Sequence, residues 1–263
     1  RKIMSHGLNI AGSATIGDPS IFRVETGIEG AFRSYPSDFP ADNTRIFMPT
    51  DTPNLAYNQR DARTKQVRTR DRRQPAMVLR QIARTCKTLA EAGHRSLVLV
   101  VSERERQVFL RMCHDEQVNV VSYGDGVMAK DASLAFRNGQ GDVLCGTGAH
   151  YTEGVDYPGK IAEVTFVLRP AYPPPNEPVT LFEERRFGSM KWKIWMWREM
   201  IRALQARGRN VRSKEDKGVT IFISQQYRRY LFGSLPTYLQ DAYVGNKTFD
   251  ECIQEAEELL VKS

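Results

Sequence analysis

Two arginines lie at a spacing that would place them on one face of a helix. Residues 205–212 read Gln-Ala-Arg-Gly-Arg-Asn-Val-Arg, and helical spacing would align four of them: Gln205, Gly208, Arg209 and Arg212. A planar guanidinium fork suits a polyphosphate better than an ammonium does, and it can stabilise the charge that grows on a transferring γ-phosphoryl group. Gly208 has no side chain, so a ligand could approach beside the arginines. A basic helix face in solvent is an equally good interpretation of these residues.

The other half of a nucleotide-hydrolysing site is missing from the sequence. There is no Gly-x-x-x-x-Gly-Lys-Ser/Thr stretch to wrap phosphates in backbone amides, and no Asp-Glu-x-His run to hold magnesium. We therefore expect ATP and Mg²⁺ to be bound mainly by a neighbouring domain outside these 263 residues. The opening Arg-Lys-Ile-Met is interpreted as a cut end rather than a natural start.

Charge favours an anionic partner, but only mildly. Lys and Arg number 38 against 31 Asp and Glu, which gives a formal net charge of +7. Residues 60–73 form a dense basic run, whereas residues 250–258 are acidic. A basic run is more often a solvated loop than a binding site, so it only supports a nucleic-acid partner.

The four cysteines are widely separated and form no Cys-x-x-Cys pair: Cys86, Cys113, Cys145 and Cys252. The spacing indicates neither a zinc site nor an iron–sulfur cluster within the chain, and it favours reduced, buried thiols in a cytoplasmic protein. The sequence shows no charged-then-apolar leader and no run of membrane-spanning length, so we expect no membrane partner.

The elements that must position these residues alternate between strand and helix. Short apolar runs rich in Val and Ile predict buried parallel strands at residues 8–11, 45–48, 96–101, 118–122, 142–145, 164–168 and 219–223. Helical spacing of apolar residues predicts helices at 75–92 and 103–114. This alternation predicts an α/β fold, a doubly wound and mostly parallel sheet with helices on both faces.

Ligands of such sheets bind beyond the carboxyl ends of the strands. The residues that follow the predicted strands are rich in small hydroxyl side chains and glycine: Ser13-Ala14-Thr15, Ser102-Glu103-Arg104, Gly146-Thr147-Gly148 and Ser224-Gln225. Such residues suit phosphate contacts, although turns favour the same residue types.

The alternation of predicted strands and helices is interrupted after residue 168. Residues 169–178 are rich in proline and must run extended, and a helical stretch with five aromatic residues follows: Phe182, Phe187, Trp192, Trp195 and Trp197. These rings could stack the bases of a single strand, but tryptophans this close together favour a core helix packed on the sheet. Beyond Ser224, residues 225–232, 236–243 and 249–261 predict a short helical tail.

Together these motifs resemble superfamily 2 helicases of the DinG/XPD type. Gln205-x-x-Gly208-Arg209-x-x-Arg212, with the strand that follows, resembles motif VI, and residues 146–159 with their Glu153-Gly154-Val155-Asp156 core resemble motif V. Residues 96–102 are similar to motif IV, and Ser13-Ala14-Thr15 is similar to motif III. The proline-rich residues 169–178 and Ser234-Leu235-Pro236 resemble later segments of DinG.

The resemblance implies that residues 1–263 are the second RecA-like motor domain of an ATP-dependent DNA helicase moving 5′ to 3′. Residues 169–200 would be an insertion and residues 225–263 a helical tail. The first RecA-like domain, with the P-loop, the magnesium-binding box and usually an iron–sulfur cluster, would lie upstream.

The resemblance also implies roles for individual residues. Arg209 and Arg212 would act as catalytic arginine fingers on the γ-phosphate, with Gln205 orienting them or the attacking water. Glu153, Gly154, Asp156 and Gly208 would belong to the ATP-binding surface. Ser102, Arg104 and Thr147 would contact single-stranded DNA, and Ser13, Ala14 and Thr15 would couple the two activities.

One departure from the DinG pattern and two rival interpretations accompany this resemblance. DinG often has Phe-Trp where this chain has Tyr151-Thr152, so a mobile-element relative, such as the DinG of type IV CRISPR systems with a CRISPR ribonucleoprotein partner, fits equally well. A nucleic-acid-binding module without motor activity is the main alternative. A Rossmann-like transferase is disfavoured, because Gly146-Thr147-Gly148 is followed by Tyr151 where a third glycine is needed. None of the four histidines lies in a recognisable nucleophile motif.

Overall fold

A parallel sheet organises the chain. The computed structural model describes residues 17–33, 35, 40–56, 58–60, 67–69, 71, 73–151, 155–173, 177–211, 213–231, 233, 240 and 242–261. Within these residues seven strands pair in parallel in the order β5-β6-β4-β7-β8-β1-β9. In chain order they are β1 Thr44–Phe47, β4 Ser96–Val100, β5 Val120–Ser122, β6 Val143–Thr147, β7 Val164–Val167, β8 Gly218–Phe222 and β9 Tyr243–Val244.

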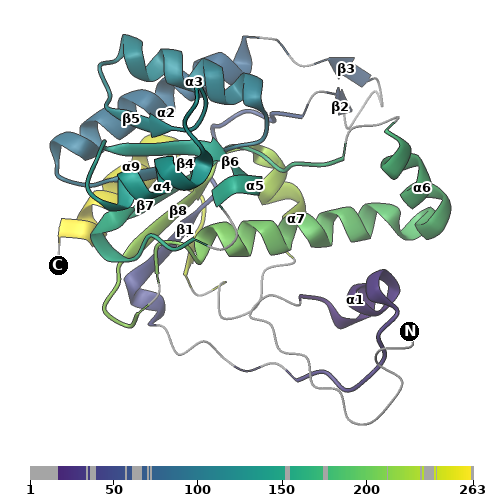
Figure 1. Ribbon diagram of the computed structural model, residues 1–263. Coiled ribbons are helices and arrows are strands. Elements are labelled where there is room, and N and C mark those ends of the chain that lie inside the picture. The colour runs from purple at the N-terminus through teal and green to yellow at the C-terminus, as the bar shows by residue number, and fades with distance from the viewer. Residues whose placement is uncertain are drawn as a thin grey trace.

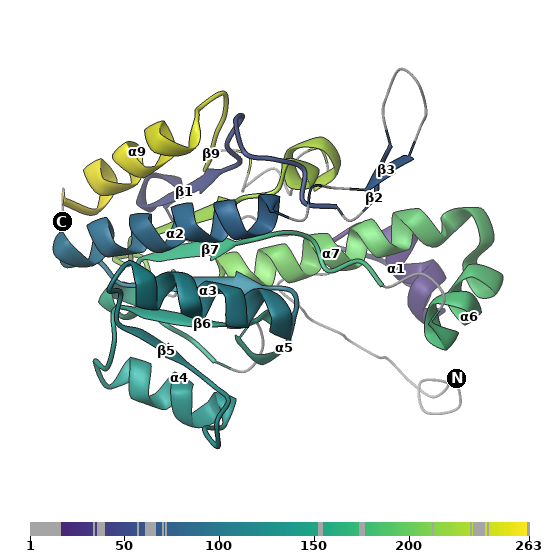
Figure 2. The same ribbon diagram turned by 90° about the horizontal axis from the view of Figure 1, so that it is seen from above.

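Helices cover both faces of this sheet (Figures 1 and 2). One face packs against α2 (Gln74–Glu91), α3 (Glu103–Asp115) and α9 (Phe249–Val261), and the other packs against α4 (Ala129–Arg137), α5 (Gly148–Tyr151) and α7 (Lys191–Arg207). Alternate residues of β4 serve the two cores, since Val98 and Val100 lie in the first and Leu97 and Leu99 in the second. The predicted doubly wound α/β fold is thereby confirmed.

Most of the predicted strands and helices are found within one or two residues of their expected bounds. Six of the seven predicted strands correspond to β1, β4, β5, β6, β7 and β8, and residues 8–11 lie outside the described part of the chain. The expected helices at 75–92, 103–114 and 249–261 correspond to α2, α3 and α9.

The helical tail was predicted less well. Tyr243, the last residue of the predicted helix 236–243, instead pairs in parallel with Ile46 as part of β9, because the apolar edge of β1 needs a partner strand. Residues Tyr227–Leu231 form a π-helical turn rather than a regular helix. The tail therefore contributes an edge strand as well as α9.

A helical extension projects beyond one end of the sheet (Figures 1 and 2). It consists of α1 (Pro19–Thr26), α6 (Pro178–Phe187) and the first half of α7. Phe22 of α1 meets Trp197 edge to face at a centroid distance of 6.3 Å, and Arg198 forms ion pairs with Glu25 and Glu183. These contacts fix α1 and α6 to α7.

The aromatic residues of this extension mainly build the core. Phe187, Trp195 and Trp197 are buried, as the core-helix interpretation predicts. Trp192 and Phe182, at 41% and 61% exposed, remain accessible. The basic run at 60–73 begins at the end of β2 (Asn58–Arg60) and contains β3 (Val67–Thr69), which pairs with β2 in antiparallel fashion on the same side of the molecule as α6 in both views. No helix among the described residues is long and apolar enough to cross a bilayer.

Candidate functional site

The residues that opened the sequence analysis do not share one helical face. Helix α7 ends at Arg207, and Gly208 and Arg209 lie in the turn that follows, so the predicted helix through residue 212 is wrong. The reason is the buried amide of Asn210, which donates to the carbonyl oxygens of Glu163 and Val219 at 3.1 and 3.2 Å. These bonds draw the chain off the helix and into β8. Arg212 lies outside the described residues.

Arg209 is held by the segment that precedes β7. Its Nη1 donates to Oδ1 of Asp156 at 2.9 Å and to the carbonyl oxygen of Val155 at 2.5 Å. Its Nε donates to the carbonyl oxygen of Gln205, and its own carbonyl accepts from the amide of Tyr157. The arginine side chain is only 11% exposed, whereas that of Asp156 is 46% exposed. Residues 53 apart in sequence thus form one charged cluster at the surface.

Among the other residues expected at this cluster, the structure describes Gln205 and Gly208. Gln205 is half-buried, and Gly208 has a helical φ of −72°. A Cβ on Gly208 would meet the carbonyl oxygens of Leu204 and Gln205 only at ordinary contact distances of 3.5 and 3.7 Å. The fold itself therefore does not require glycine at position 208. The absence of a side chain there leaves room beside Arg209. Glu153 and Gly154 lie outside the described residues.

The Arg209 cluster lies at the amino-terminal edge of the sheet. Asn210, next to Arg209, bonds to Glu163, which immediately precedes β7, and to Val219, the second residue of β8. The residues that follow the strands, by contrast, lie at the carboxyl edge. The structure therefore divides the predicted site residues between two edges of one sheet.

At the carboxyl edge, Ser102 is the N-cap of α3 and forms a capping box with Glu105. Its Oγ accepts from the Glu105 amide at 3.3 Å and donates to Glu105 Oε2 at 3.1 Å. Arg104, the second residue of α3, is exposed. Thr147 ends the neighbouring strand β6, and its Oγ1 accepts from the Tyr123 hydroxyl at 3.4 Å. Ser13, Ala14 and Thr15 lie outside the described residues.

Gly146, which precedes Thr147, is required by close packing. A Cβ at this position would come within 2.2 Å of the ring of Tyr151. That ring is fully buried, so it has no room to move aside. Glycine thus lets α5 fold back tightly on the end of β6.

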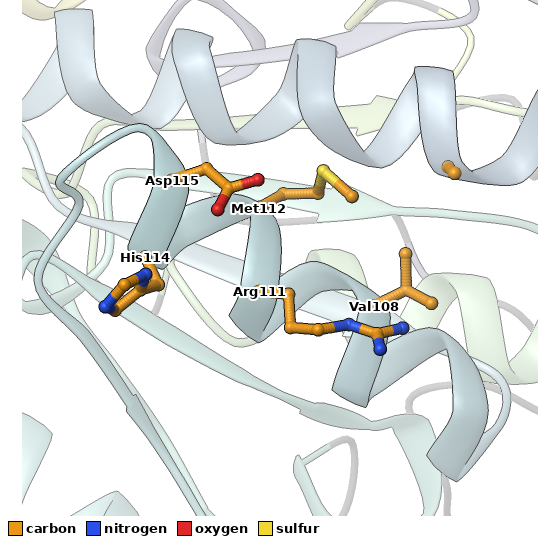
Figure 3. Close-up of a pocket in the computed structure, with 6 residues that line it drawn as sticks. Val108, Arg111, Met112, His114 and Asp115 are labelled. Carbon is orange, nitrogen blue, oxygen red and sulfur yellow. The ribbon is translucent and has the colours of Figure 1, made fainter.

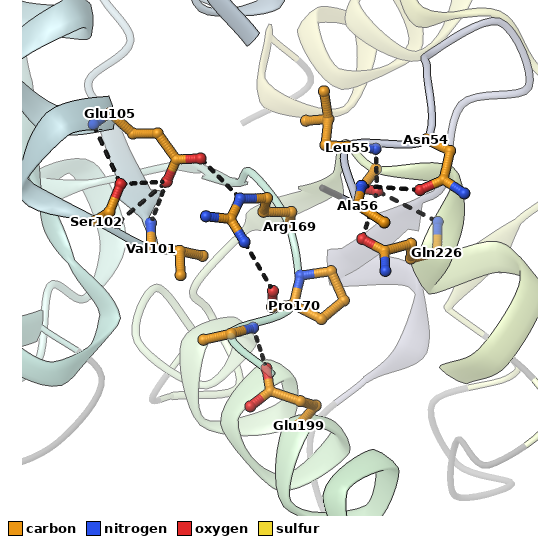
Figure 4. A network of polar contacts seen from close by, with 12 residues as sticks. Asn54, Leu55, Ala56, Val101, Ser102, Glu105, Arg169, Pro170, Glu199 and Gln226 are labelled. Carbon is orange, nitrogen blue, oxygen red and sulfur yellow. Dashed lines mark hydrogen bonds and ion pairs between the residues drawn. The ribbon is translucent and has the colours of Figure 1, made fainter. Parts of the chain in front are cut away.

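Two residues at the carboxyl edge were missed as site candidates (Figure 4). The carboxylate of Glu105 accepts from Nε of Arg169 at 2.7 Å, and Arg169 lies two residues beyond the end of β7. The spacing Ser-x-x-Glu at 102–105 is the signature of a capping box and would have revealed the role of Glu105. Nothing in the sequence pairs Arg169 with it.

Ser224 at the end of β8 has a structural role. It is 1% exposed, and its Oγ accepts from the amide of Leu55 at 3.2 Å and donates to Oε1 of Gln226 at 3.3 Å. Figure 4 shows Leu55 and Gln226 across the edge from Arg169. Ser224 therefore ties the end of β8 to the segment that follows β1.

A groove between α2 and α3 lies apart from both edges (Figure 3). It has a volume of about 450 Å³ and is lined by Ala76, Val108, Arg111, Met112, His114 and Asp115. None of the residues predicted for a functional site lines it.

All four cysteines are buried and unpaired, as predicted. Burial raises the pKa of Cys113 and of Cys252 to about 12, and it raises the pKa of Cys86 and Cys145 as well. Protonated thiols of this kind are poor nucleophiles. Across the described parts of the chain, no three His, Cys, Asp or Glu side chains gather in a way that could hold a metal ion.

Comparison with known proteins identifies the family. Residues 85–241, more than half of the chain, match the model of the helicase C-terminal domain. A solved XPD helicase structure superposes with a TM-score of 0.62 at 14% identity, covering 88% of this chain and 41% of that one. A structure of XPD in its apo form gives 0.57 at 13% identity, covering 82% and 44%. No curated protein sequence matches.

The structural matches are distant in sequence, so they show the fold, which is that of a RecA-like helicase domain. The chain spans less than half the length of the XPD structures that it matches.

Proposed function

Because the chain belongs to the family of helicase C-terminal domains, we propose that it is the second motor domain of an ATP-dependent DNA helicase of the DinG/XPD type. Residues 1–263 would form this one domain, with residues 169–200 as an insertion and residues 225–263 as its tail. The observation that carries the proposal is the contact of Arg209 with Asp156, which brings the segments that resemble motifs V and VI together in one surface cluster. Its partner would be a first RecA-like domain of the same protein, carrying the P-loop.

Arg209 is the group of this cluster suited to a γ-phosphate. A guanidinium is charged at any physiological pH and binds phosphate oxygens as a planar fork. Asp156 and the Val155 carbonyl fix its direction, so little conformational entropy is lost when a ligand arrives. Arg212, Gln205, Glu153, Gly154 and Gly208 would complete the same surface.

The residues of the cluster fit a phosphate rather than a metal ion. The carboxylate of Asp156 is already paired with Arg209, and no group of three metal-ligating side chains is found among the described residues. Mg²⁺ and most of the nucleotide would be bound by the first domain, and an iron–sulfur cluster, if the protein has one, would lie there too. When both domains close, Arg209 would stabilise charge that develops on the phosphoryl group.

Strand binding would take place at the opposite, carboxyl edge. Thr147 and Arg104 follow the adjacent strands β6 and β4, and they would contact backbone phosphates of single-stranded DNA together with the Ser102 corner. Ser13, Ala14 and Thr15 would couple the two edges. By analogy with the family, movement would be 5′ to 3′, and a mobile-element relative would also contact a CRISPR ribonucleoprotein complex.

The test is Arg209→Ala in the full-length protein that carries this chain. We expect kcat for DNA-stimulated ATP hydrolysis to fall on the order of a thousandfold, because the lost guanidinium acts on the transition state. The dissociation constant for single-stranded DNA should change little, since Arg209 lies at the other edge. Arg111→Ala removes the same charge from the exposed surface of α3 and should leave both quantities unchanged.

An unchanged kcat in Arg209→Ala would remove this residue from the catalytic role. Strand affinity that is indifferent to nucleotide, combined with unchanged hydrolysis, would instead favour the nucleic-acid-binding module without motor activity.

A further inference from the structure

The hydroxyl of Ser102 is poorly placed to donate to a phosphate. A serine hydroxyl has a single proton, and Oγ of Ser102 donates it to Oε2 of Glu105 at 3.1 Å. The same oxygen accepts from the Glu105 amide at 3.3 Å. Phosphate oxygens only accept hydrogen bonds, so a strand at this corner needs a different donor.

Arg169 offers such donors. Its Nε is engaged with Oε1 of Glu105 at 2.7 Å, and its Nη1 contacts the carbonyl oxygen of Pro170 at 3.5 Å. Among the described residues Nη2 of Arg169 has no hydrogen-bond partner, while the side chain is 21% exposed. The guanidinium is therefore anchored at one end and accessible at the other.

The anchor of Arg169 is itself rigid. Glu105 has only 7% of its side chain exposed, and it also accepts from the amides of Val101 and Ser102, both at 3.1 Å. On the other side of the loop, the amide of Ala171 donates to the buried Glu199 at 2.6 Å. Figure 4 shows both attachments. Because the loop is held from α3 and from α7, binding would cost Arg169 little further ordering.

We propose that Arg169 is the phosphate-binding group of the strand site at the carboxyl edge, and that Glu105 is the residue that positions it. The assignment rests on the proposed function, because it names the contact by which that site would hold a strand. Ser102 follows β4 and Arg169 follows β7, and these strands are neighbours in the sheet. The exposed Arg104 adds a second positive charge at the same edge. A guanidinium that binds the phosphodiester backbone carries no base preference.

The experiment measures binding of fluorescein-labelled oligothymidylate to the full-length protein over a range of NaCl concentrations. In Arg169→Gln we expect the dissociation constant to rise about tenfold, and the slope of log K against log[NaCl] to fall by about 0.7, the value for one lost phosphate contact on a single strand. Ser102→Ala leaves the donors of Arg169 in place, so its loss of affinity should be smaller than that of Arg169→Gln, and the salt slope should be retained because serine carries no charge. Arg111→Gln, the charge-matched control on α3, should leave affinity and slope unchanged.

Glu105→Gln tests the positioning role. Arg169 keeps its charge in this variant but loses its ionic anchor, so affinity should fall about threefold while the salt slope is retained. The double variant Glu105→Gln/Arg169→Gln should bind no more weakly than Arg169→Gln alone, because Glu105 acts through Arg169. Arg169→Lys keeps the charge, so it should retain the salt slope but bind more weakly. This variant replaces Arg169→Gln as the test if the glutamine variant loses its cooperative thermal transition.

The outcomes distinguish a wrong assignment of Arg169 from a wrong proposed function. If the parent protein binds the strand and Arg169→Gln keeps both affinity and slope, the assignment of Arg169 is overturned and the proposed function stands. If Ser102→Ala loses more affinity than Arg169→Gln, the serine is the phosphate contact and the assignment of Arg169 is overturned. A parent protein that does not bind the strand overturns the proposed function and this assignment together.

Discussion

What an arginine can do in this chain depends on how much of its guanidinium is already used. Arg106 is 2% exposed and donates to Glu103, to Ser122 and to the carbonyl oxygen of Tyr123. Its hydrogen bond to Glu103 holds the pKa of that carboxyl at about 2, so the pair is ionised under all ordinary conditions. Arg106 is a structural residue. By contrast, the side chain of Arg169 is 21% exposed at the carboxyl edge, and Arg209 pairs at the amino edge with an Asp156 side chain that is 46% exposed.

The pairing of Arg209 with Asp156 leads to a prediction about these two residues. In the full-length protein, Asp156→Asn should lower kcat about tenfold, because the amide oxygen can still accept a hydrogen bond but no longer holds the guanidinium by charge. The double variant Asp156→Asn/Arg209→Ala should be no slower than Arg209→Ala, since Asp156 acts through Arg209. Steady-state ATP hydrolysis by the parent protein, the two single variants and the double variant completes this double-mutant cycle. Fully additive losses would mean that Asp156 has a role of its own.

At the scale of elements, the buried carboxylate of Glu183 helps to hold α6 against α7. Glu183 accepts from Nε1 of Trp195 at 2.8 Å and from Nη1 of Arg198 at 2.6 Å. Burial alone would raise the pKa of Glu183, but the hydrogen bonds from Arg198 and Trp195 outweigh it and lower the pKa below its usual value. The ionised form therefore stabilises the folded joint.

The sign of this shift fixes the pH dependence. A carboxylate with a lowered pKa contributes its full stabilisation above the usual glutamate value of about 4.3, and that contribution is lost as the pH falls through the lower folded value. We expect tryptophan fluorescence to change in this acid range as the Trp195 indole loses its acceptor. Glu183→Gln should abolish that step and leave the rest of the titration alone. A step of the same size in the glutamine variant would assign it to another group.

How far the sequence predicts these elements depends on their length and on what stabilises them. Strands such as β4 and β7 are continuous runs of apolar residues buried on both faces, so their composition alone is diagnostic. The two-residue β9 is too short to have a pattern and exists because β1 has a free edge. The end of α7 was missed for a related reason, because the bonds that terminate it reach Glu163 and Val219, and such distant contacts leave no local signal.

The contacts among the candidate site residues were predicted to a similar extent, and the roles of these residues stay predictions. Arg209 and Asp156 were both identified from their motifs, and they are in direct contact. The pairing of Glu105 with Arg169 was missed because the two residues are 64 positions apart and meet only through the adjacency of β4 and β7. Residue type and spacing can identify a motif, but they cannot reveal which side chains of that motif are already engaged with each other.

At the scale of the whole molecule, the sheet separates two groups of candidate site residues. The Arg209 cluster lies beside the amino ends of β7 and β8, and Ser102, Thr147 and Arg169 lie beyond the carboxyl ends of β4, β6 and β7. Each of these strands is only four or five residues long, so the two edges are about 15 Å apart at the usual rise per residue. A rigid body of this kind can transmit a change at one edge to the other only by moving as a unit. Motion against a second domain would supply that movement.

The same separation predicts what the 263-residue chain can do by itself. It should not hydrolyse ATP above background, because no P-loop in its sequence can surround the β- and γ-phosphates, and Arg209 supplies only one side of the reaction. Phosphate release by the purified chain, with and without oligothymidylate, is compared with release by the full-length protein. The Arg209→Ala chain serves as the control, since a contaminating ATPase would be unaffected by that substitution. Turnover by the pure chain that disappears in Arg209→Ala would mean that one domain holds a complete active site, and the proposal of a site divided between two domains would have to be abandoned.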